Sequence, residues 1–308
     1  MCRALLYAGQ PLLLDHLLYA PDSSLVKQSF NPQMLHMLNL AGFGMLAWDQ
    51  GSHDADAPFR YHATRLPIFD RNLKSLASKV RASCVLAHVR GVAYRTEVQV
   101  SEQNTHPFYY PGAPVALAHN GDLYRVNEYR PSILRHIRPE FAAQIAGTTD
   151  SELMYALLLS MLPTDGAPLD AQRLGEAVLK MFDVIAAARR EAGVAISSSV
   201  NLFVTDGVST AAIRYCFDFG CYRTEDPGAV HEANLNYLSL WYTIGQAYGL
   251  HEGEWKMVGG DDEADSVIIA SEPLTQDVTT WLEIPPYSML YVDRREGDRA
   301  IDCIELSL

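Results

Sequence analysis

The chain opens with the stretch Met1-Cys2-Arg3-Ala4-Leu5-Leu6-Tyr7-Ala8-Gly9. The small side chain at position 2 predicts removal of the initiator methionine, which leaves Cys2 as the first residue. A terminal cysteine carries a nucleophilic thiol and a free α-amine that titrates near ~8, so one residue supplies both nucleophile and base. Ala4–Tyr7 has the apolar character of a short buried strand, which would hold the terminus in place. A disordered chain start and a lipid attached to Cys2 are the alternative interpretations.

The composition favours a globular protein and narrows its partners. The 308 residues are 48% hydrophobic and carry a formal net charge of -13. Lys and Arg do not cluster between aromatic residues, so we expect no nucleic-acid partner. The apolar runs are too short to span a bilayer, and the first is broken at Asp15 and His16, which argues against a membrane anchor or a secretory signal. We therefore expect a cytoplasmic protein.

Cysteine and histidine spacing gives no metal or disulfide pattern. The five cysteines are scattered and odd in number, which favours a reducing compartment; they are Cys2, Cys84, Cys216, Cys221 and Cys303. No His and Cys cluster has zinc-ligand spacing, and the Walker-type and GxGxxG motifs are absent. We expect neither a metal nor a cofactor.

Hydrophobic periodicity predicts strands at both ends of the chain and helices in the middle. We expect helices over Pro11–Leu18, Asn72–Val80 (capped by Asp70), Leu153–Leu162 (with a Thr149 and Glu152 capping box) and Ala171–Arg190, and a loop or lid over Asp22–Ser29. The expected strands are Gly42–Trp48, Phe59–Arg65, Cys84–Val89, Val115–Ala118, Asn201–Thr205, Ala211–Phe217, Leu238–Ile244, Val267–Ala270 and Met289–Val292. This order suggests two sheets with helices packed outside them, in one domain.

Three further positions are chemically suggestive. Arg90 ends an apolar strand, where a guanidinium can bind a carboxylate in a bidentate manner, although a surface arginine is the alternative. Asn120-Gly121 follows another apolar strand and offers an amide and a backbone N–H to an oxyanion, although an ordinary Asn-Gly turn fits as well. Asp150 stands at a helix start, where it can bind an ammonium group or simply cap the helix.

With Cys2, these positions fit one class of substrate. A free α-amino acid head needs a cation for its carboxylate and an anion for its ammonium, and a scissile side-chain amide needs a nucleophile and an oxyanion hole. Arg90, Asp150, Cys2 and Asn120-Gly121 supply these four functions. Glutamine or another γ-glutamyl compound is the molecule that they match.

The ordered motifs resemble the class II glutamine amidotransferases, which are N-terminal-nucleophile hydrolases. They are the Cys2-Arg3 start, Ser24-Leu25 with Gln28-Ser29, Gly42-Phe43-Gly44, Ala87-His88-Val89-Arg90, Asn104-Thr105-His106-Pro107-Phe108, Ala118-His119-Asn120-Gly121, Asp150-Ser151-Glu152, Thr205-Asp206-Gly207, Ala270-Ser271-Glu272-Pro273-Leu274 and Trp281. The set looks most like the branch that holds the γ-glutamyl hydrolase of ergothioneine biosynthesis and the amidotransferase-like subunit of glutathione degradation.

The resemblance implies an α+β fold, a four-layer αββα sandwich, in a single glutamine amidotransferase type-2 domain over residues 2–308. It implies that Cys2 attacks the γ-carbonyl and forms a γ-glutamyl thioester, while Asn120 and Gly121 stabilise the oxyanion. It further implies that Arg90 binds the substrate carboxylate and Asp150 its ammonium.

Two segments depart from the family pattern, namely Gly91-Val92-Ala93-Tyr94-Arg95 after the arginine and Asn39-Leu40-Ala41 before Gly42. Both affect the expected substrate rather than the reaction type.

We interpret His88, His106 and His119 as structural, because a terminal-amine base leaves no role for an imidazole. We retain a backbone contact between His106 and the substrate.

Several functions stay open on these grounds. The chain is either a glutaminase that feeds ammonia to a partner or a hydrolase that removes γ-glutamyl from a peptide or thiol compound. A separate synthase or peptidase subunit would then carry any acceptor chemistry. A non-catalytic binding or regulatory subunit of an amidotransferase-like complex is the alternative outside the enzyme class.

Overall fold

The computed structural model describes residues 2–34, 38–92, 99–222, 224–231, 239–260, 264–295 and 300–306. The chain divides into two compact units. The first unit comprises Met1–Pro107 and Ser239–Ile284, and the second comprises Phe108–Leu238 and Pro285–Leu308. The single domain expected over residues 2–308 stays a prediction.

The first unit is built on a seven-stranded sheet with the strand order β13-β9-β12-β1-β4-β2-β3, and every pairing in it is antiparallel. Its strands are β1 (Arg3–Leu13), β2 (Phe43–Trp48), β3 (Phe59–Ala63), β4 (Arg81–Val89), β9 (Trp241–Gly245), β12 (Ser266–Ala270) and β13 (Leu282–Glu283). A separate hairpin consists of β10 (Ala247–His251) and β11 (Glu254–Val258), and neither this hairpin nor β13 was among the expected strands.

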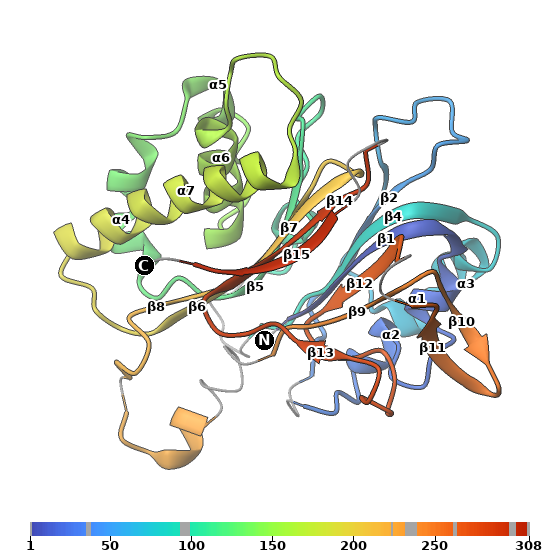
Figure 1. Ribbon diagram of the computed structural model, residues 1–308. Helices are drawn as coiled ribbons and strands as arrows, with labels where there is room; N and C mark the ends of the chain where they lie inside the picture. The colour runs from blue at the N-terminus through green and yellow to red at the C-terminus, as the bar shows by residue number, and fades with distance from the viewer. Residues whose placement is uncertain are drawn as a thin grey trace. The chain divides into compact units, whose positions relative to one another are not determined.

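Helices line one face of this sheet (Figure 1). They are α1 (Asp15–Leu18), α2 (Leu25–Gln28) and α3 (Arg71–Ala77), with short 3-10 turns η1 (Pro67–Phe69) and η2 (Glu102–Asn104). Leu5 and Tyr7 of β1 point toward the helical side and belong to its core, whereas Leu6 points to the opposite face and is equally buried. The sheet is therefore apolar on both faces.

The helix expected over Pro11–Leu18 is wrong in its first half. The β1 strand continues to Leu13, and the ladder between β1 and β4 shifts register between Ala8 and Leu12. Proline has no N–H to donate, so a strand accepts it best where the ladder is interrupted. Only Asp15–Leu18 is helical.

The loop or lid expected over Asp22–Ser29 is also wrong, because α2 forms there and is buried. Leu25 and Val26 pack into the core of the first unit. The Gln28 side chain donates to the carbonyl oxygens of Ser23 (2.8 Å) and Glu272 (3.2 Å). The contact with Glu272, which is distant in the sequence, helps to order a segment whose local sequence is polar and typical of turns.

The second unit pairs a six-stranded antiparallel sheet with a layer of longer helices. The strand order is β15-β14-β7-β6-β5, and the short β8 pairs with β6 beside this path. The strands are β5 (Ala116–Gly121), β6 (Ser198–Thr205), β7 (Ser209–Arg214), β8 (Cys216–Phe217), β14 (Ser288–Asp293) and β15 (Ala300–Glu305). No expected strand corresponds to β15, which is an edge strand with mostly exposed side chains.

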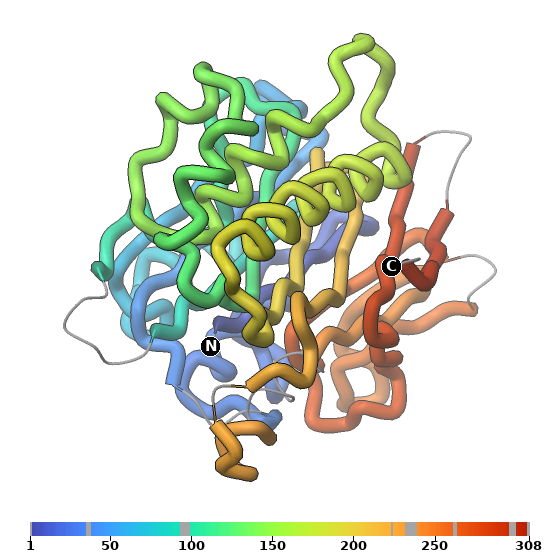
Figure 2. Tube along the Cα trace, turned by 90° about the vertical axis from the view of Figure 1, so that its left-hand side faces the viewer, coloured from blue at the N-terminus to red at the C-terminus, as the bar shows by residue number. Residues whose placement is uncertain are grey.

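The helices of the second unit are α4 (Val126–Leu134), α5 (Pro139–Ala142), α6 (Asp150–Met161) and α7 (Ala171–Glu191). The long helix α7 lies across β7 and β14, as the yellow-green tube in Figure 2 shows. Its apolar residues form one core with α6 and with the sheet residues Leu202 and Ile213. The expected α+β class, two sheets each with helices on one face, is confirmed.

Local signals predicted several elements well. Asp70 caps the α3 helix, and its carboxylate accepts the N–H groups of Asn72 (3.1 Å) and Leu73 (3.0 Å). The expected strands at Gly42–Trp48, Cys84–Val89 and Val267–Ala270 correspond to β2, β4 and β12. The start of the strand expected over Leu238–Ile244 lies outside the described residues, and β9 begins at Trp241.

Candidate active site

Cys2 stands immediately before β1, and its thiol contacts the backbone after β4. The Sγ atom lies 3.4 Å from the Gly91 nitrogen and 3.5 Å from the Gly91 oxygen. Arg3, the next residue, is already paired with Val89 in the sheet interior. The expected short strand behind Cys2 is thus confirmed and is longer than Ala4–Tyr7, so the thiol is attached to a paired strand rather than to a frayed end.

Arg90 is buried, with 6% of its surface exposed, so the alternative of a surface arginine is wrong. Its backbone is held by the Ala41-Gly42 segment, because its N–H donates to the Gly42 carbonyl (2.8 Å) and its carbonyl accepts from the Ala41 N–H (2.9 Å). The guanidinium donates to the carbonyl oxygen of Gln99 at 2.9 Å. Gly91 follows directly, so the structure brings Arg90 and Cys2 together through one residue.

The segment that departs from the family pattern is described only at its start. Gly91 and Val92 are half-buried, whereas Ala93, Tyr94 and Arg95 lie outside the described residues. The second departure, before β2, includes Asn39, which is buried and donates its backbone N–H to the Ser29 carbonyl at 2.8 Å.

His88 and His106 lie in the interior of the first unit. Their rings are in contact, with centroids 4.2 Å apart and planes tilted by 34°, and both side chains are buried. The carbonyl oxygen of His106 faces Gly44 of β2, where a Cβ atom would approach it to 2.0 Å. Glycine at position 44 therefore allows the His106 segment to lie against the sheet.

In the second unit, Asn120 and Gly121 belong to β5, so the expected end of the strand at Ala118 is wrong, as is the alternative of an Asn-Gly turn. Asn120 and Gly121 pair with Asn201 and Val200 of β6. Pairing with β6 keeps the chain extended through two residues that would otherwise favour a turn.

The direction of the Gly121 N–H follows from the strand register. The Asp122 N–H donates to Ser199 at 3.0 Å on the β6 side, and Leu117 exchanges hydrogen bonds with Phe108 on the other side. Backbone groups in an antiparallel strand point to alternate sides, so Gly121 points the same way as Leu117. Since β5 ends the sheet, this N–H faces away from its neighbour strand.

Asp150 is the first residue of α6, and Thr149 rather than Asp150 caps the helix. The Thr149 hydroxyl accepts the Glu152 N–H at 3.2 Å, while the Glu152 carboxylate accepts from Gly147 at 2.6 Å instead of returning to Thr149. Only half of the expected capping box forms. Asp150 accepts from the Leu123 N–H at 2.7 Å, which ties it to the loop after β5.

His119 connects β5 to α6 beneath this loop. Its Nδ1 lies 2.9 Å from the Ser151 hydroxyl. Burial lowers the pKa of His119, and the nearby Asp150 carboxylate opposes that effect only in part. A neutral, hydrogen-bonded imidazole agrees with the structural interpretation of this residue.

The candidate residues therefore form two sets, one in each unit. Cys2, Arg90 and the His106 segment gather in the first unit, and Asn120, Gly121 and Asp150 gather in the second. Arg3 and Glu272, which form an ion pair within the first unit, were not among the residues expected to have a role of their own. The sequence signal for this ion pair was a charged residue within each of two otherwise apolar motifs.

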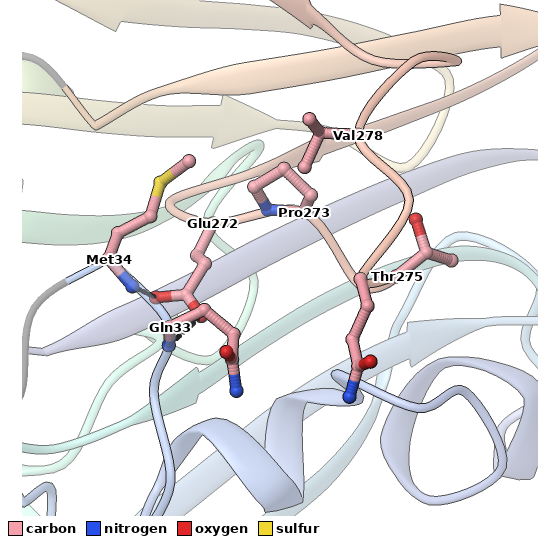
Figure 3. A pocket seen from close by; sticks show the side chains of 7 residues that line it. Gln33, Met34, Glu272, Pro273, Thr275 and Val278 are labelled. Carbon is pink, nitrogen blue, oxygen red and sulfur yellow. Dashed lines mark hydrogen bonds between the residues drawn. The ribbon is translucent and has the colours of Figure 1, made fainter.

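A pocket of about 160 Å³ lies beside Glu272 in the first unit, and its lining combines apolar and polar side chains (Figure 3). It is lined by Gln33, Met34, Glu272, Pro273, Thr275, Gln276 and Val278.

Among the residues that the structure describes, no group of three His, Cys, Asp or Glu side chains is arranged to hold a metal ion. Within the same ranges, every helix is too short or too polar to cross a membrane.

These features agree with one family. The family model described as "Glutamine amidotransferases class-II" matches residues 60–224, more than half of the chain, and the chain belongs to this family. The resemblance seen in the ordered motifs is thus confirmed.

Two curated relatives narrow the comparison. The chain is 29% identical over 313 residues to "Probable glutamine amidotransferase DUG3" of Saccharomyces cerevisiae, which covers 96% of this chain and 82% of that protein. It is 31% identical over 127 residues to "Gamma-glutamyl-hercynylcysteine sulfoxide hydrolase" of Mycobacterium tuberculosis, which covers 41% of this chain and 51% of that protein.

Solved structures show the fold. A glutamine aminotransferase class-II domain protein from Silicibacter pomeroyi superposes with a TM-score of 0.59 at 20% identity, and each chain is covered completely. Glutamine phosphoribosylpyrophosphate amidotransferase from B. subtilis superposes with a TM-score of 0.51 at 17% identity, over 100% of this chain and 50% of that chain. The expected N-terminal-nucleophile hydrolase type of fold is confirmed by this likeness.

Proposed function

We propose that the protein hydrolyses a γ-glutamyl amide with Cys2, freed of Met1, as the nucleophile. The observation that carries the proposal is the contact of the Cys2 thiol with Gly91, directly after the buried Arg90. The thiol thus contacts the residue that follows Arg90, and the guanidinium of an arginine recognises carboxylates. A lipid-anchored or frayed terminus gives no reason for that arrangement.

The reaction follows from the chemistry of a terminal cysteine. The α-amine of Cys2 takes the thiol proton, and Sγ attacks the γ-carbonyl carbon. The proton then passes to the leaving nitrogen, the C–N bond breaks, and ammonia or an amine departs. Water attacks the resulting γ-glutamyl thioester, which releases the carboxylate and restores the thiol.

In this proposal, each candidate residue has a role in substrate binding or in catalysis. Arg90 binds the α-carboxylate, and the backbone of the His106 segment lines the same side. Asp150, already oriented by Leu123, binds the α-ammonium. The Asn120 amide and the outward Gly121 N–H stabilise the oxyanion, a contribution typically worth ~10²–10³ in rate for each donor.

The relatives support γ-glutamyl chemistry without choosing the leaving group. One is named as a probable glutamine amidotransferase and the other as a γ-glutamyl-hercynylcysteine sulfoxide hydrolase. We propose hydrolysis within this chain, with any acceptor reaction on a separate synthase or peptidase subunit. A panel of glutamine and γ-glutamyl amines of increasing size distinguishes a glutaminase from a γ-glutamyl peptide or thiol hydrolase.

The test is the intact mass of the protein before and after treatment with 6-diazo-5-oxo-norleucine, together with turnover of the amide panel. This reagent forms a carbon–sulfur bond with loss of dinitrogen. We expect a mass without Met1 and one adduct, which is absent in Cys2→Ala and unchanged in Cys221→Ala, a matched exposed thiol. Retained Met1, no adduct and no turnover would contradict the proposal and favour a non-catalytic subunit.

A further inference from the structure

Arg3 and Glu272 form an ion pair inside the first unit. The Arg3 Nε and Nη2 atoms each lie 3.0 Å from Glu272 Oε2, and only 1% of either side chain is exposed. Removing two charges from water costs several kcal/mol per ion, and an apolar pair of the same volume often stabilises a fold equally well. Stability alone therefore does not explain this pair.

The third arm of the guanidinium reaches the candidate nucleophile. Arg3 Nη1 donates to the carbonyl oxygen of Cys2 at 3.1 Å. That carbonyl belongs to the planar peptide group between Cys2 and Arg3, which also contains the Cys2 Cα. The contact therefore fixes the position of the Cα atom. The Gly91 N–H also holds the Sγ atom of Cys2. Because the carbonyl and the thiol are both held, the α-amine of Cys2 keeps one orientation relative to the thiol.

Glu272 is itself held in place and can orient the guanidinium. Its carboxylate accepts the N–H groups of Gln33 at 2.6 Å and Met34 at 3.3 Å, as the dashed lines in Figure 3 show. The preceding residue, Ser271, donates its N–H to Ala4 at 2.9 Å and accepts the Ala4 N–H on its hydroxyl at 3.1 Å. These two hydrogen bonds join Ser271 to β1 at Ala4, the residue that follows Arg3.

We infer that the Arg3–Glu272 pair positions Cys2 for catalysis, with Glu272 orienting Arg3 and Arg3 holding the Cys2 carbonyl. This inference rests on the proposed function. Arg3 and Glu272 are positioning residues, because neither needs to touch the substrate. A misplacement of about 1 Å at a reacting group costs ~10²-fold in rate, so the pair contributes through geometry.

The experiment compares wild-type protein with Arg3→Met, Arg3→Lys and Glu272→Gln. Each is checked by intact mass for removal of Met1, and by thermal unfolding for its folded fraction at the assay temperature. Labelling of Cys2 by 6-diazo-5-oxo-norleucine is followed to completion, which yields a maximal rate constant, a half-saturating concentration and a final stoichiometry.

For Arg3→Met we expect complete labelling with a maximal rate constant lower by ~10²-fold and a half-saturating concentration within about threefold of wild type. Arg3→Lys keeps the charge but lacks the fork that spans two acceptors, so it should recover only part of the rate. A purely structural pair would instead lower the final stoichiometry at an unchanged rate constant, and that result would overturn the inference.

Arg295→Met is the matched control. Arg295 also pairs with a carboxylate, Asp206 at 3.3 Å, but it lies in the second unit and contacts the Leu169 carbonyl rather than Cys2. We expect a lower melting temperature with an unchanged labelling rate constant. If Arg3→Met unfolds at the assay temperature, Arg3→Lys and Glu272→Gln decide the question by the same criteria.

A second readout is independent of catalysis. Trimming of Cys2 by a broad-specificity aminopeptidase, read as the mass of one lost cysteine, reports how firmly the first residue is held. Loss of a charged hydrogen bond should accelerate trimming about tenfold in Arg3→Met. Unchanged trimming overturns the inference, whereas absence of a wild-type adduct contradicts only the proposed function.

Discussion

The Asp150 carboxylate accepts the Leu123 N–H at 2.7 Å and thereby joins the first turn of α6 to the loop after β5. Its other oxygen accepts the Ser151 N–H at 2.8 Å. Two backbone donors therefore fix the carboxylate, and Thr149 carries out the capping. An aspartate that is oriented but not needed as a cap is well suited to bind a ligand cation.

We expect Asp150→Asn to keep the fold and weaken substrate binding. The asparagine oxygen can still accept from Leu123, but the negative charge for an ammonium group is lost. A hydrogen bond between charged groups contributes ~1.5–3 kcal/mol, so kcat/KM for glutamine should fall by about 10- to 100-fold. Asp170→Asn is the control, since Asp170 likewise accepts a helix N–H, from Arg173 at 2.7 Å, and its substitution should leave kcat/KM unchanged.

Asn120→Ala should lower kcat more than it changes KM. The amide is proposed to act on the oxyanion, which exists only along the reaction, and its loss should lower kcat by ~10²–10³. Asn201→Ala removes the amide directly across the strand pair. If both variants lose kcat equally, burial of a polar face rather than oxyanion stabilisation would explain the effect of Asn120.

Gly121→Ala should destabilise the protein. A Cβ at this position would lie 1.9 Å from the Ser199 oxygen, so β5 and β6 must separate to accept it. Overpacking of this kind typically costs ~1–3 kcal/mol, measurable as a lower urea midpoint. Gly260→Ala, where nothing lies within 4 Å of the added Cβ, should leave the midpoint unchanged, and an equal effect at both positions would refute the steric explanation.

His62 should make the protein less stable in mild acid. Burial lowers its pKa to about 4, and the Arg60 guanidinium acts in the same direction. As the pH falls below the ordinary value near ~6.5, the unfolded chain binds the proton first, so stability is complete above that pH and declines toward pH 4. The decline is on the order of 2 kcal/mol after allowance for partial solvent access.

Urea unfolding at pH 7 and pH 4.5 measures this dependence. The free energy of unfolding of His62→Gln should change less between the two pH values than that of the wild type. His53→Gln removes an exposed histidine and should behave as the wild type. A His62→Gln curve parallel to the wild type would show that other groups cause the acid sensitivity.

Local sequence was sufficient where an element carries its own signals. Asp70 and the apolar spacing after it predicted α3, and the amphipathic pattern of Ala171–Arg190 predicted the long α7. Both helices satisfy their first N–H groups with a side chain at the cap and bury one apolar face. These interactions span only a few residues, so the local sequence is enough to predict them.

Tertiary pairing decided the segments where local signals conflict with the fold. Pro11 lies in a strand because β1 is held at Leu12 and Leu13 by β4, and Asn120-Gly121 stays extended because β6 pairs with it. In each case hydrogen bonds to a distant strand outweigh a local preference for a helix or a turn.

The sequence by itself determined the chemistry available at this protein's candidate site, because residue type decides which groups act as nucleophile, cation or donor. It therefore indicated Cys2, Arg90 and Asp150. Only the tertiary structure decided what holds them, such as the Arg3–Glu272 pair between residues 269 positions apart. Such contacts leave no periodicity in the chain, because they depend on which strands meet.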